Sequence, residues 1–150
     1  MLMAMLQATA SRVPDRVAVR YQEERLRYRE LTELALRLAH ALASLGIAPG
    51  DRVALLLPNV PPFVISFFAI AGLGAVVVPL NPQFKEDELE FYFRHCDITA
   101  VITDEQSLGV CQQILTRQGR SAAIIVTANG IAGTESFWGL IERHAAKALP

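Results

Sequence analysis

The segment VALLLPNVPPFVISFFAIAGLGAVVVPLNPQF, residues 53–84, contains no Asp, Glu, Lys or Arg. Because an uncharged segment of this length is unfavourable in water, either lipid or protein has to cover it. A membrane-spanning helix needs about 20 unbroken apolar residues. Helix-breaking residues interrupt this segment at Pro58, Pro61, Pro62, Gly72, Gly74 and Pro79. Each proline inside a helix would cost about 3 kcal/mol, so the segment is predicted to lie inside a protein core, with no transmembrane span.

The interruptions divide the segment into a β-α-β unit. Residues 53–57 are too few for a helix, and residues 75–78 are rich in β-branched Val, so both are predicted to be strands buried on two faces. Between them, Pro62 suits the first turn of a helix, and residues 63–71 are apolar on all sides. The sequence therefore predicts two neighbouring strands joined by a crossover helix that is nearly as buried as they are.

The composition indicates one domain, residues 1–150, with an unusually apolar surface. The net charge of −1 and the pI near 6.3 give no electrostatic reason to expect nucleic acid or an anionic membrane as a partner. Hydrophobic residues make up 52% of the chain and charged residues 19%, with a mean hydropathy of +0.31. A domain of this size needs more polar surface than that. We therefore expect part of the surface to pack on something outside this chain.

Two features bear on the cellular compartment. Cys96 and Cys111 fall on predicted helices without C-x-x-C spacing, which suits buried thiols in a reducing, cytoplasmic environment; no pattern supports a disulfide between them. Residues 1–10, MLMAMLQATA, end in a string similar to a signal-peptide cleavage site. No Lys or Arg precedes the short apolar part, so a short amphipathic helix is predicted instead.

Residues 1–50 are predicted to form a helix, a hairpin and a second helix. The first arm of the hairpin is residues 17–21, the turn is 22–25, and the returning arm is 26–28. From Arg29 the apolar residues follow helical spacing, and Gly46 is the expected C′ residue of that helix, with Ile47 placed for the accompanying apolar contact.

Residues 51–150 are predicted to alternate between strands and helices. After the β-α-β unit we expect a loop at 81–85, a helix opening at 86–88, a strand at 100–103, a helix at 107–117, a strand at 122–126, a loop at 128–134 and a helix at 136–149. This alternation implies right-handed crossovers. The fold class is therefore α/β, a mostly parallel layered sheet with helices on both faces.

Candidate phosphate sites fail on their context. Gly72-Leu73-Gly74 lacks the third glycine of a dinucleotide fingerprint and precedes a strand, which indicates a tight turn. Loop 58–62 follows the first buried strand, where a flavodoxin-like module would hold phosphate, but its prolines lack N–H donors. Asp104 follows a strand as a receiver-domain phosphoacceptor would, yet the acidic pair such a domain needs is absent, so helix capping is expected.

Candidate catalytic and metal residues have ordinary explanations as well. His95, Cys96 and Asp97 are adjacent on a predicted helix, so their side chains point to different faces. His40, His95 and His144 do not have the spacing of metal ligands. Loop 81–85 leaves the carboxyl end of a strand, where α/β proteins often bind ligands, and it could line a pocket or be an ordinary surface loop. No catalytic, cofactor-binding or metal-binding residue is assigned.

Several strings occur in a characteristic order: RVPDRVAV at 12–19, LRYREL at 26–31, LGIAPGDRVA at 45–54, FFAIAGLGAVVVPLNP at 67–82, Glu88-Leu89, and AVITD at 100–104. As a set they resemble the opening of the adenylate-forming (AMP-binding) acyl-CoA synthetases, over about residues 10–105. The resemblance implies the partial N-terminal subdomain of the acyl-CoA synthetase-like fold. Arg27 departs from the usual Ser or Thr of the family and is expected to weaken the start of its helix.

The resemblance also implies a reaction that this chain is not equipped to perform. The family activates a carboxylic acid with ATP and Mg²⁺ as an acyl-adenylate and then transfers the acyl group to coenzyme A. Its phosphate loop, its later motifs and its C-terminal lysine have no counterpart here, since Lys85 and Lys147 are the only lysines and neither lies in a glycine-rich loop. The chain is therefore expected to be an inactive N-terminal scaffold fragment of such a ligase, a fatty-acid–CoA ligase, with the remainder of that enzyme as its partner. The alternative is a stand-alone binding or assembly module that associates with itself through an apolar surface.

Overall fold

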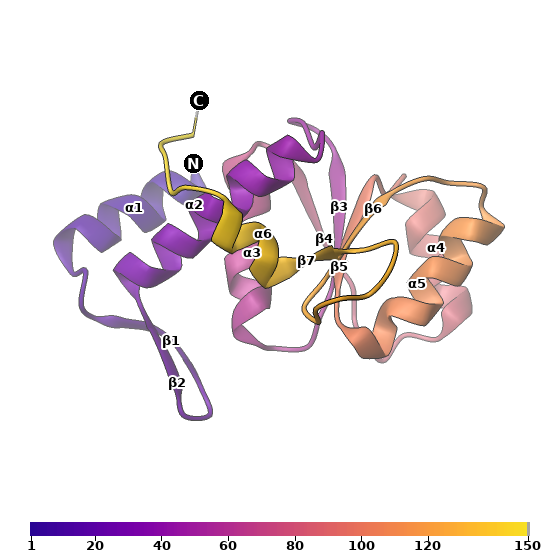
Figure 1. The fold of residues 1–150 in the computed structure, drawn as a ribbon, viewed down its shortest axis with the longest axis horizontal. Helices are drawn as coiled ribbons and strands as arrows, with labels where there is room; N and C mark the ends of the chain where they lie inside the picture. The colour runs from indigo at the N-terminus through magenta and orange to yellow at the C-terminus, as the bar shows by residue number, and fades with distance from the viewer. Residues whose placement is uncertain (150) are drawn as a thin grey trace.

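The computed structural model describes residues 1–149 as a parallel sheet with helices on both faces and a hairpin beside it (Figure 1). In chain order the elements are α1 (Leu2–Arg12), β1 (Val17–Tyr21), β2 (Glu24–Arg27), α2 (Tyr28–Ser44), β3 (Arg52–Leu56), α3 (Pro61–Gly72), β4 (Val76–Pro79), α4 (Glu86–His95), β5 (Ala100–Thr103), α5 (Glu105–Arg117), β6 (Ala123–Val126), β7 (Glu135–Ser136) and α6 (Phe137–Arg143). The predicted α/β class is confirmed.

The five-stranded sheet has the order β4-β3-β5-β6-β7, and every neighbouring pair is parallel. β3 lies between β4 and β5, with Val53 aligned to Val77 on one side and to Ala100 on the other. The predicted strands 53–57 and 75–78 therefore do pair in one sheet. β1 and β2 form a separate antiparallel hairpin.

The side chains of β3 alternate between two cores. Val53, Leu55 and Leu57 join the core under α1, α2, α3 and α6, whereas Ala54 and Leu56 join the core under α4 and α5. Figure 1 shows α4 and α5 side by side on one face of the sheet, and the elements of the N-terminal part on the other. Both faces of β3 are thus covered, which explains why the charge-free segment begins there.

β4 corrects one prediction from the sequence. The strand was expected to be buried on both faces, but it is the edge strand of the sheet, and the side chain of Val76 is 48% exposed. The run of Val residues indicates a strand correctly, because β-branched side chains favour extended backbone. It does not distinguish a central strand from an edge strand, since that depends on how the crossovers order the strands.

The C-terminal segment differs from a second prediction that was made from the sequence. The helix expected at 136–149 is only seven residues long and ends at Arg143, and the two-residue strand β7 before it was not anticipated. His144 has extended backbone, and the following residues lie along α2 instead: the Lys147 carbonyl accepts a hydrogen bond from His40 Nε2 at 3.0 Å, and the His144 carbonyl accepts one from Arg37 at 3.3 Å. Contacts with α2 therefore replace the last helical turns.

The boundaries near the hairpin differ by a few residues. β2 begins at Glu24 where the turn was expected, and α2 begins at Tyr28, one residue early. Arg27 provides no side-chain cap, but its backbone N–H donates to Glu30 at 2.7 Å, which fixes the first turn. The departure at Arg27 is thus compensated by the residue three positions later.

Four helices end with the same backbone motif. After α2, the Gly46 N–H bonds the Ala43 carbonyl and the Ile47 N–H bonds the Leu42 carbonyl, as the sequence predicted, with Gly46 at φ +88°. α3 and α5 end in the same way at Gly74 and Gly119. α4 has Asp97 at the equivalent position, with φ +52°. A non-glycine residue in this left-handed conformation needs a compensating interaction.

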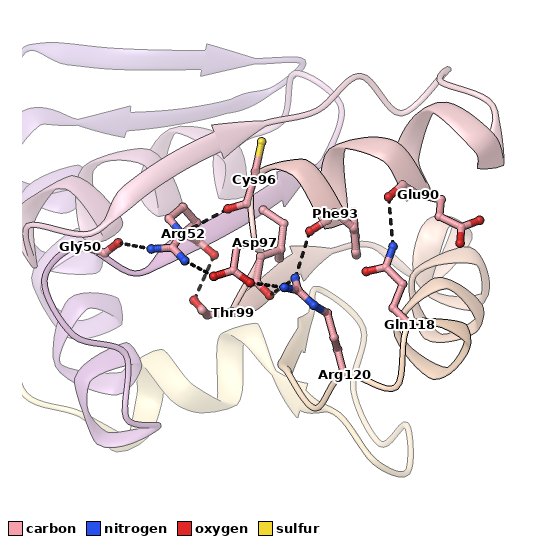
Figure 2. A network of polar contacts seen from close by, with 10 residues as sticks. Gly50, Arg52, Glu90, Phe93, Cys96, Asp97, Thr99, Gln118 and Arg120 are labelled. Atoms are coloured by element: carbon pink, nitrogen blue, oxygen red, sulfur yellow. Dashed lines mark hydrogen bonds and ion pairs between the residues drawn. The ribbon is translucent and has the colours of Figure 1, made fainter.

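Figure 2 shows that interaction at the amino end of the sheet. The Asp97 carboxylate forms ion pairs with Arg52, at the start of β3, and with Arg120, after α5. Arg52 also donates to the Cys96 carbonyl at 3.2 Å, and Arg120 donates to the Phe93 carbonyl at 3.1 Å. Asp97 therefore ties the end of α4 to the strand and the helix beside it.

The charge on Asp97 makes this tie sensitive to acid. The hydrogen bond and positive charge of Arg120, and to a lesser degree those of Arg52, hold the pKa of Asp97 below its ordinary value. A carboxylate whose pKa is lowered by folding stabilises the folded state above its unfolded pKa, about 4, and this contribution disappears as the pH falls through the folded pKa.

We expect Asp97→Asn, which keeps a side chain tolerant of the left-handed conformation, to lower the melting temperature at pH 7. The difference from the parent chain should shrink as the pH falls below about 4, because the parent then loses the same charge. Melting curves followed by circular dichroism between pH 7 and pH 2.5 measure this convergence. A gap that stays constant over the whole range would mean that the charge of Asp97 is not the stabilising feature.

α3 contains a buried hydroxyl group, that of Ser66. The residue is fully buried, and within residues 1–149 its Oγ has no hydrogen-bond partner. A buried polar atom that loses its water and gains no partner costs about 1–3 kcal/mol.

Ser66→Ala should therefore raise the free energy of unfolding by about 1 kcal/mol, because it removes the unpaired oxygen. Urea unfolding measures the change. The matched control is Thr103→Val, where the buried hydroxyl does donate, to the Leu56 carbonyl at 3.0 Å, and where stability should fall. A loss of stability in both variants would contradict the account of Ser66.

Candidate functional site

A hollow of about 570 Å³ lies at the carboxyl ends of β3 and β4. The loops that follow the two strands form the walls of this hollow, and these walls carry both apolar and amide side chains. The lining residues are Leu57, Pro58, Asn59, Phe63, Pro79, Leu80, Asn81, Pro82 and Gln83. The loop predicted at 81–85 is present, and it lines this hollow together with loop 58–62. The sequence analysis considered both loops but did not bring them together, although parallel pairing of their strands makes them neighbours.

A second hollow of about 430 Å³ adjoins the first and shares Pro58, Pro82 and Gln83 with it. It extends to Asp104 and Ser107, so it spans the carboxyl ends of β3 and β5. From these two adjacent strands the chain leaves in opposite directions, toward β4 and toward β6. Such a switch point is where open α/β sheets usually bind ligands.

The chemistry around both hollows does not fit nucleotide phosphates. A phosphate site at a helix start needs free N–H donors and no competing negative charge. α3 begins with Pro61 and Pro62, which carry no N–H group. The first turn of α4 is acidic, and α5 begins with Asp104 and Glu105. The helix starts at this edge therefore either lack N–H donors or carry negative charge that would repel a phosphate. No step of ATP chemistry can be assigned to them.

Asp104 acts as a helix cap, as the sequence predicted. Its Oδ1 accepts a hydrogen bond from the Ser107 N–H at 2.9 Å. The Gly72–Gly74 segment is also the predicted tight turn between helix and strand, with Gly74 at φ +75° and the Ala75 N–H bonded to the Ile70 carbonyl at 3.2 Å. Both features are explained by the backbone they organise.

The side chains of the His-Cys-Asp string at 95–97 make different contacts and have three different roles. The ring of His95 stacks on Phe91 at 5.2 Å, Cys96 occupies the C-cap of α4, and Asp97 joins the ion pairs of Figure 2. His40 and His144 lie far away in the contacts between α2 and the C-terminal segment. Within residues 1–149, no group of three His, Cys, Asp or Glu side chains is arranged to hold a metal ion.

The two cysteines are free thiols in different surroundings. Cys111 is fully buried between α5 and the sheet, whereas Cys96 is partly exposed. Burial raises the pKa of the Cys111 thiol to about 12, so it stays protonated at neutral pH.

Iodoacetamide at pH 8 should therefore modify Cys96 in the folded chain and leave Cys111 unmodified, because only an accessible thiolate reacts. In urea both thiols should react. Peptide mass spectrometry after timed alkylation distinguishes the two. Equal rates for the two cysteines in the folded chain would show that Cys111 is accessible.

Comparisons with known proteins agree with this architecture. The family model described as AMP-binding enzyme matches residues 6–146. The chain therefore belongs to the AMP-binding enzyme family. Its match extends beyond the strings at 10–105 and includes β6, β7 and α6.

The proteins to which the chain is similar include fatty-acid–CoA ligases and a nonribosomal peptide synthetase of Aspergillus fumigatus. The chain is 37% identical to a long-chain-fatty-acid–CoA ligase of Bacillus subtilis, over 68% of this chain and 18% of that protein. It is 32% identical to a medium/long-chain-fatty-acid–CoA/3-oxocholest-4-en-26-oate–CoA ligase of Mycobacterium marinum, over 91% of this chain and 25% of that protein. The structure of the N-terminal domain of FACL13 from Mycobacterium tuberculosis matches with a TM-score of 0.85 and 30% identity, over 99% of this chain and 37% of that one.

The fold is shared more widely. An anthranilate CoA ligase, AuaEII, superposes with a TM-score of 0.91 at 24% identity, over 97% of this chain and 28% of that one. The chain thus shares the fold of part of the N-terminal domain of FACL13. It spans only about a fifth to a quarter of the length of the two curated relatives. In residues 1–149, no helix is both long and apolar enough to cross a membrane.

Proposed function

We propose that this chain forms the N-terminal scaffold of an AMP-forming fatty-acid–CoA ligase that works in the cytoplasm. The observation that carries the proposal is the match to the N-terminal domain of FACL13 over 99% of this chain, together with fatty-acid–CoA ligases among the curated relatives. Two unpaired cysteines are consistent with a reducing compartment.

In this proposal the chain supplies structure, and the rest of the ligase supplies chemistry. The complete enzyme would bind ATP, Mg²⁺ and coenzyme A. ATP would supply the leaving pyrophosphate, Mg²⁺ would neutralise the charge of that pyrophosphate, and coenzyme A would supply the acceptor thiol. The described residues hold the central sheet and present the hollows at its carboxyl edge. The remainder of the ligase is the proposed partner of the carboxyl edge of the sheet, where these hollows lie.

The 150-residue chain alone should not catalyse ATP–pyrophosphate exchange, because its helix starts offer no phosphate site. The assay measures incorporation of labelled pyrophosphate into ATP with fatty acids of different length and with benzoate. The long-chain-fatty-acid–CoA ligase of Bacillus subtilis is the positive control. Exchange by the isolated chain above background would overturn the proposal.

A chimaera tests the positive side of the same proposal. Replacing the matching segment of the Bacillus subtilis ligase with this chain should preserve exchange with long-chain fatty acids, because the scaffold is equivalent. In the matched control, Leu55→Asp in the grafted segment should abolish exchange, since Leu55 is fully buried in β3. A chimaera that folds like its parent but has no exchange activity would contradict an equivalent scaffold role.

A further inference from the structure

α4 presents an exposed aromatic side chain on its outer face. Phe91 is 58% exposed, whereas Leu89 and Phe93 on the inner face are 2% and 0% exposed. The Phe91 ring is held in place by two neighbours: it stacks on His95 with ring centres 5.2 Å apart and meets Tyr92 edge-on at 5.5 Å. Aromatic side chains are enriched at the centres of protein contact surfaces, so an exposed ring that its neighbours hold in place is a candidate for such a centre.

Charges flank Phe91 in an ordered way. Asp87 and Glu88 precede it and are exposed, and Arg94 and His95 follow it and are exposed. The outer face of α4 is thus acidic at its beginning, aromatic at its middle and basic at its end. We call these five residues the α4 face.

The α4 face is complementary to a second copy of itself. Asp87 and Arg94 are seven residues apart and lie on one side of Phe91, and Glu88 and His95 lie on the other side. If two α4 helices pack antiparallel about a two-fold axis at Phe91, Asp87 faces Arg94 of the second copy and Glu88 faces His95. A two-fold contact repeats each of these pairs, so the acidic end of each helix meets the basic end of the other.

We propose that the chain forms a two-fold symmetric dimer through the α4 face, with the two Phe91 rings in contact at the axis. Burial of the two rings supplies the apolar centre, and the Asp87–Arg94 pairs set the antiparallel orientation. The contact is small, so the dimer forms reversibly at high protein concentration.

The α4 face is better suited to this role than the hollow between α2 and α6. That hollow is lined by Leu34, Trp138 and Ile141, but its rim contains Glu30, Glu33 and Glu142 with only Arg37. Arg37 pairs with Glu33 at 2.7 Å, as Arg94 pairs with Glu90 at 3.4 Å. The acidic excess of the rim would bring like charges together in a pair of copies, whereas the α4 face carries both signs of charge.

Sedimentation velocity over a wide concentration range tests the proposal on the 150-residue chain. The parent chain should shift reversibly from monomer to dimer, and Phe91→Glu should weaken the dimer at least tenfold. The matched control is Met5→Glu, which places the same charge on another exposed apolar side chain, 61% exposed on α1, and should leave the dimer unchanged. A parent chain that stays monomeric throughout, or a dimer that survives Phe91→Glu, overturns the proposal.

A charge exchange tests the orientation. Arg94→Glu places Glu opposite Asp87 in its own dimer, and Asp87→Lys places Lys opposite Arg94, so each variant alone should be monomeric. A mixture of the two should restore the dimer, because both pairs at this position are then of opposite charge. Asp87 lies in the acidic first turn of α4, so circular dichroism first checks that this variant keeps its helices. A mixture of folded variants that stays monomeric overturns the antiparallel α4 contact.

Discussion

The structure depends on the burial of one strand, β3, from every side. Its backbone is paired with β4 and β5, and its side chains enter two cores in alternation. From Val53 onward, a strand in this position has no surface on which a charged side chain could reach water, and Arg52 lies at its partly exposed amino end. The chain therefore has to supply helices for both faces, and the elements from α1 to α6 are arranged around that requirement. The unusual apolarity of residues 53–84 follows from the same position.

The two ends of the sheet are built by opposite means. At the amino end, ion pairs and carbonyl contacts converge on Asp97 and fasten β3, α4 and the segment after α5 together. At the carboxyl end, proline-containing loops around Pro58 and Pro82 leave two adjoining hollows. The amino end of the sheet is thus held by polar contacts, whereas the carboxyl end is open. A ligase scaffold of the proposed kind would need both, a fixed base and a surface that further chain can complete.

The sequence predicted the elements well where the cause was local. Helical periodicity, the C′ glycine at Gly46 and the cap at Asp104 all act within a few residues, and each was confirmed. The exposed position of β4 and the early end of α6 depend on contacts made far along the chain, such as that of His40 with Lys147, and were missed. For the site, the prolines of loop 58–62 and its lack of Ser or Thr predict that it does not hold a flavin phosphate, and this stays a prediction. The sequence did not show that this loop and loop 81–85 enclose one hollow, because that requires the parallel register of β3 and β4.

The short edge strand limits how the protein can misassemble. An open strand edge with Val at three successive positions is a template for unwanted pairing with other chains, and no lysine lies within β4 to discourage it. Pro79 closes the strand after those residues, and proline has no N–H to offer an incoming chain. An intruding strand would therefore find few backbone partners before the template ends. Ordered fibrous aggregation should for this reason be harder to start from β4 than its composition suggests.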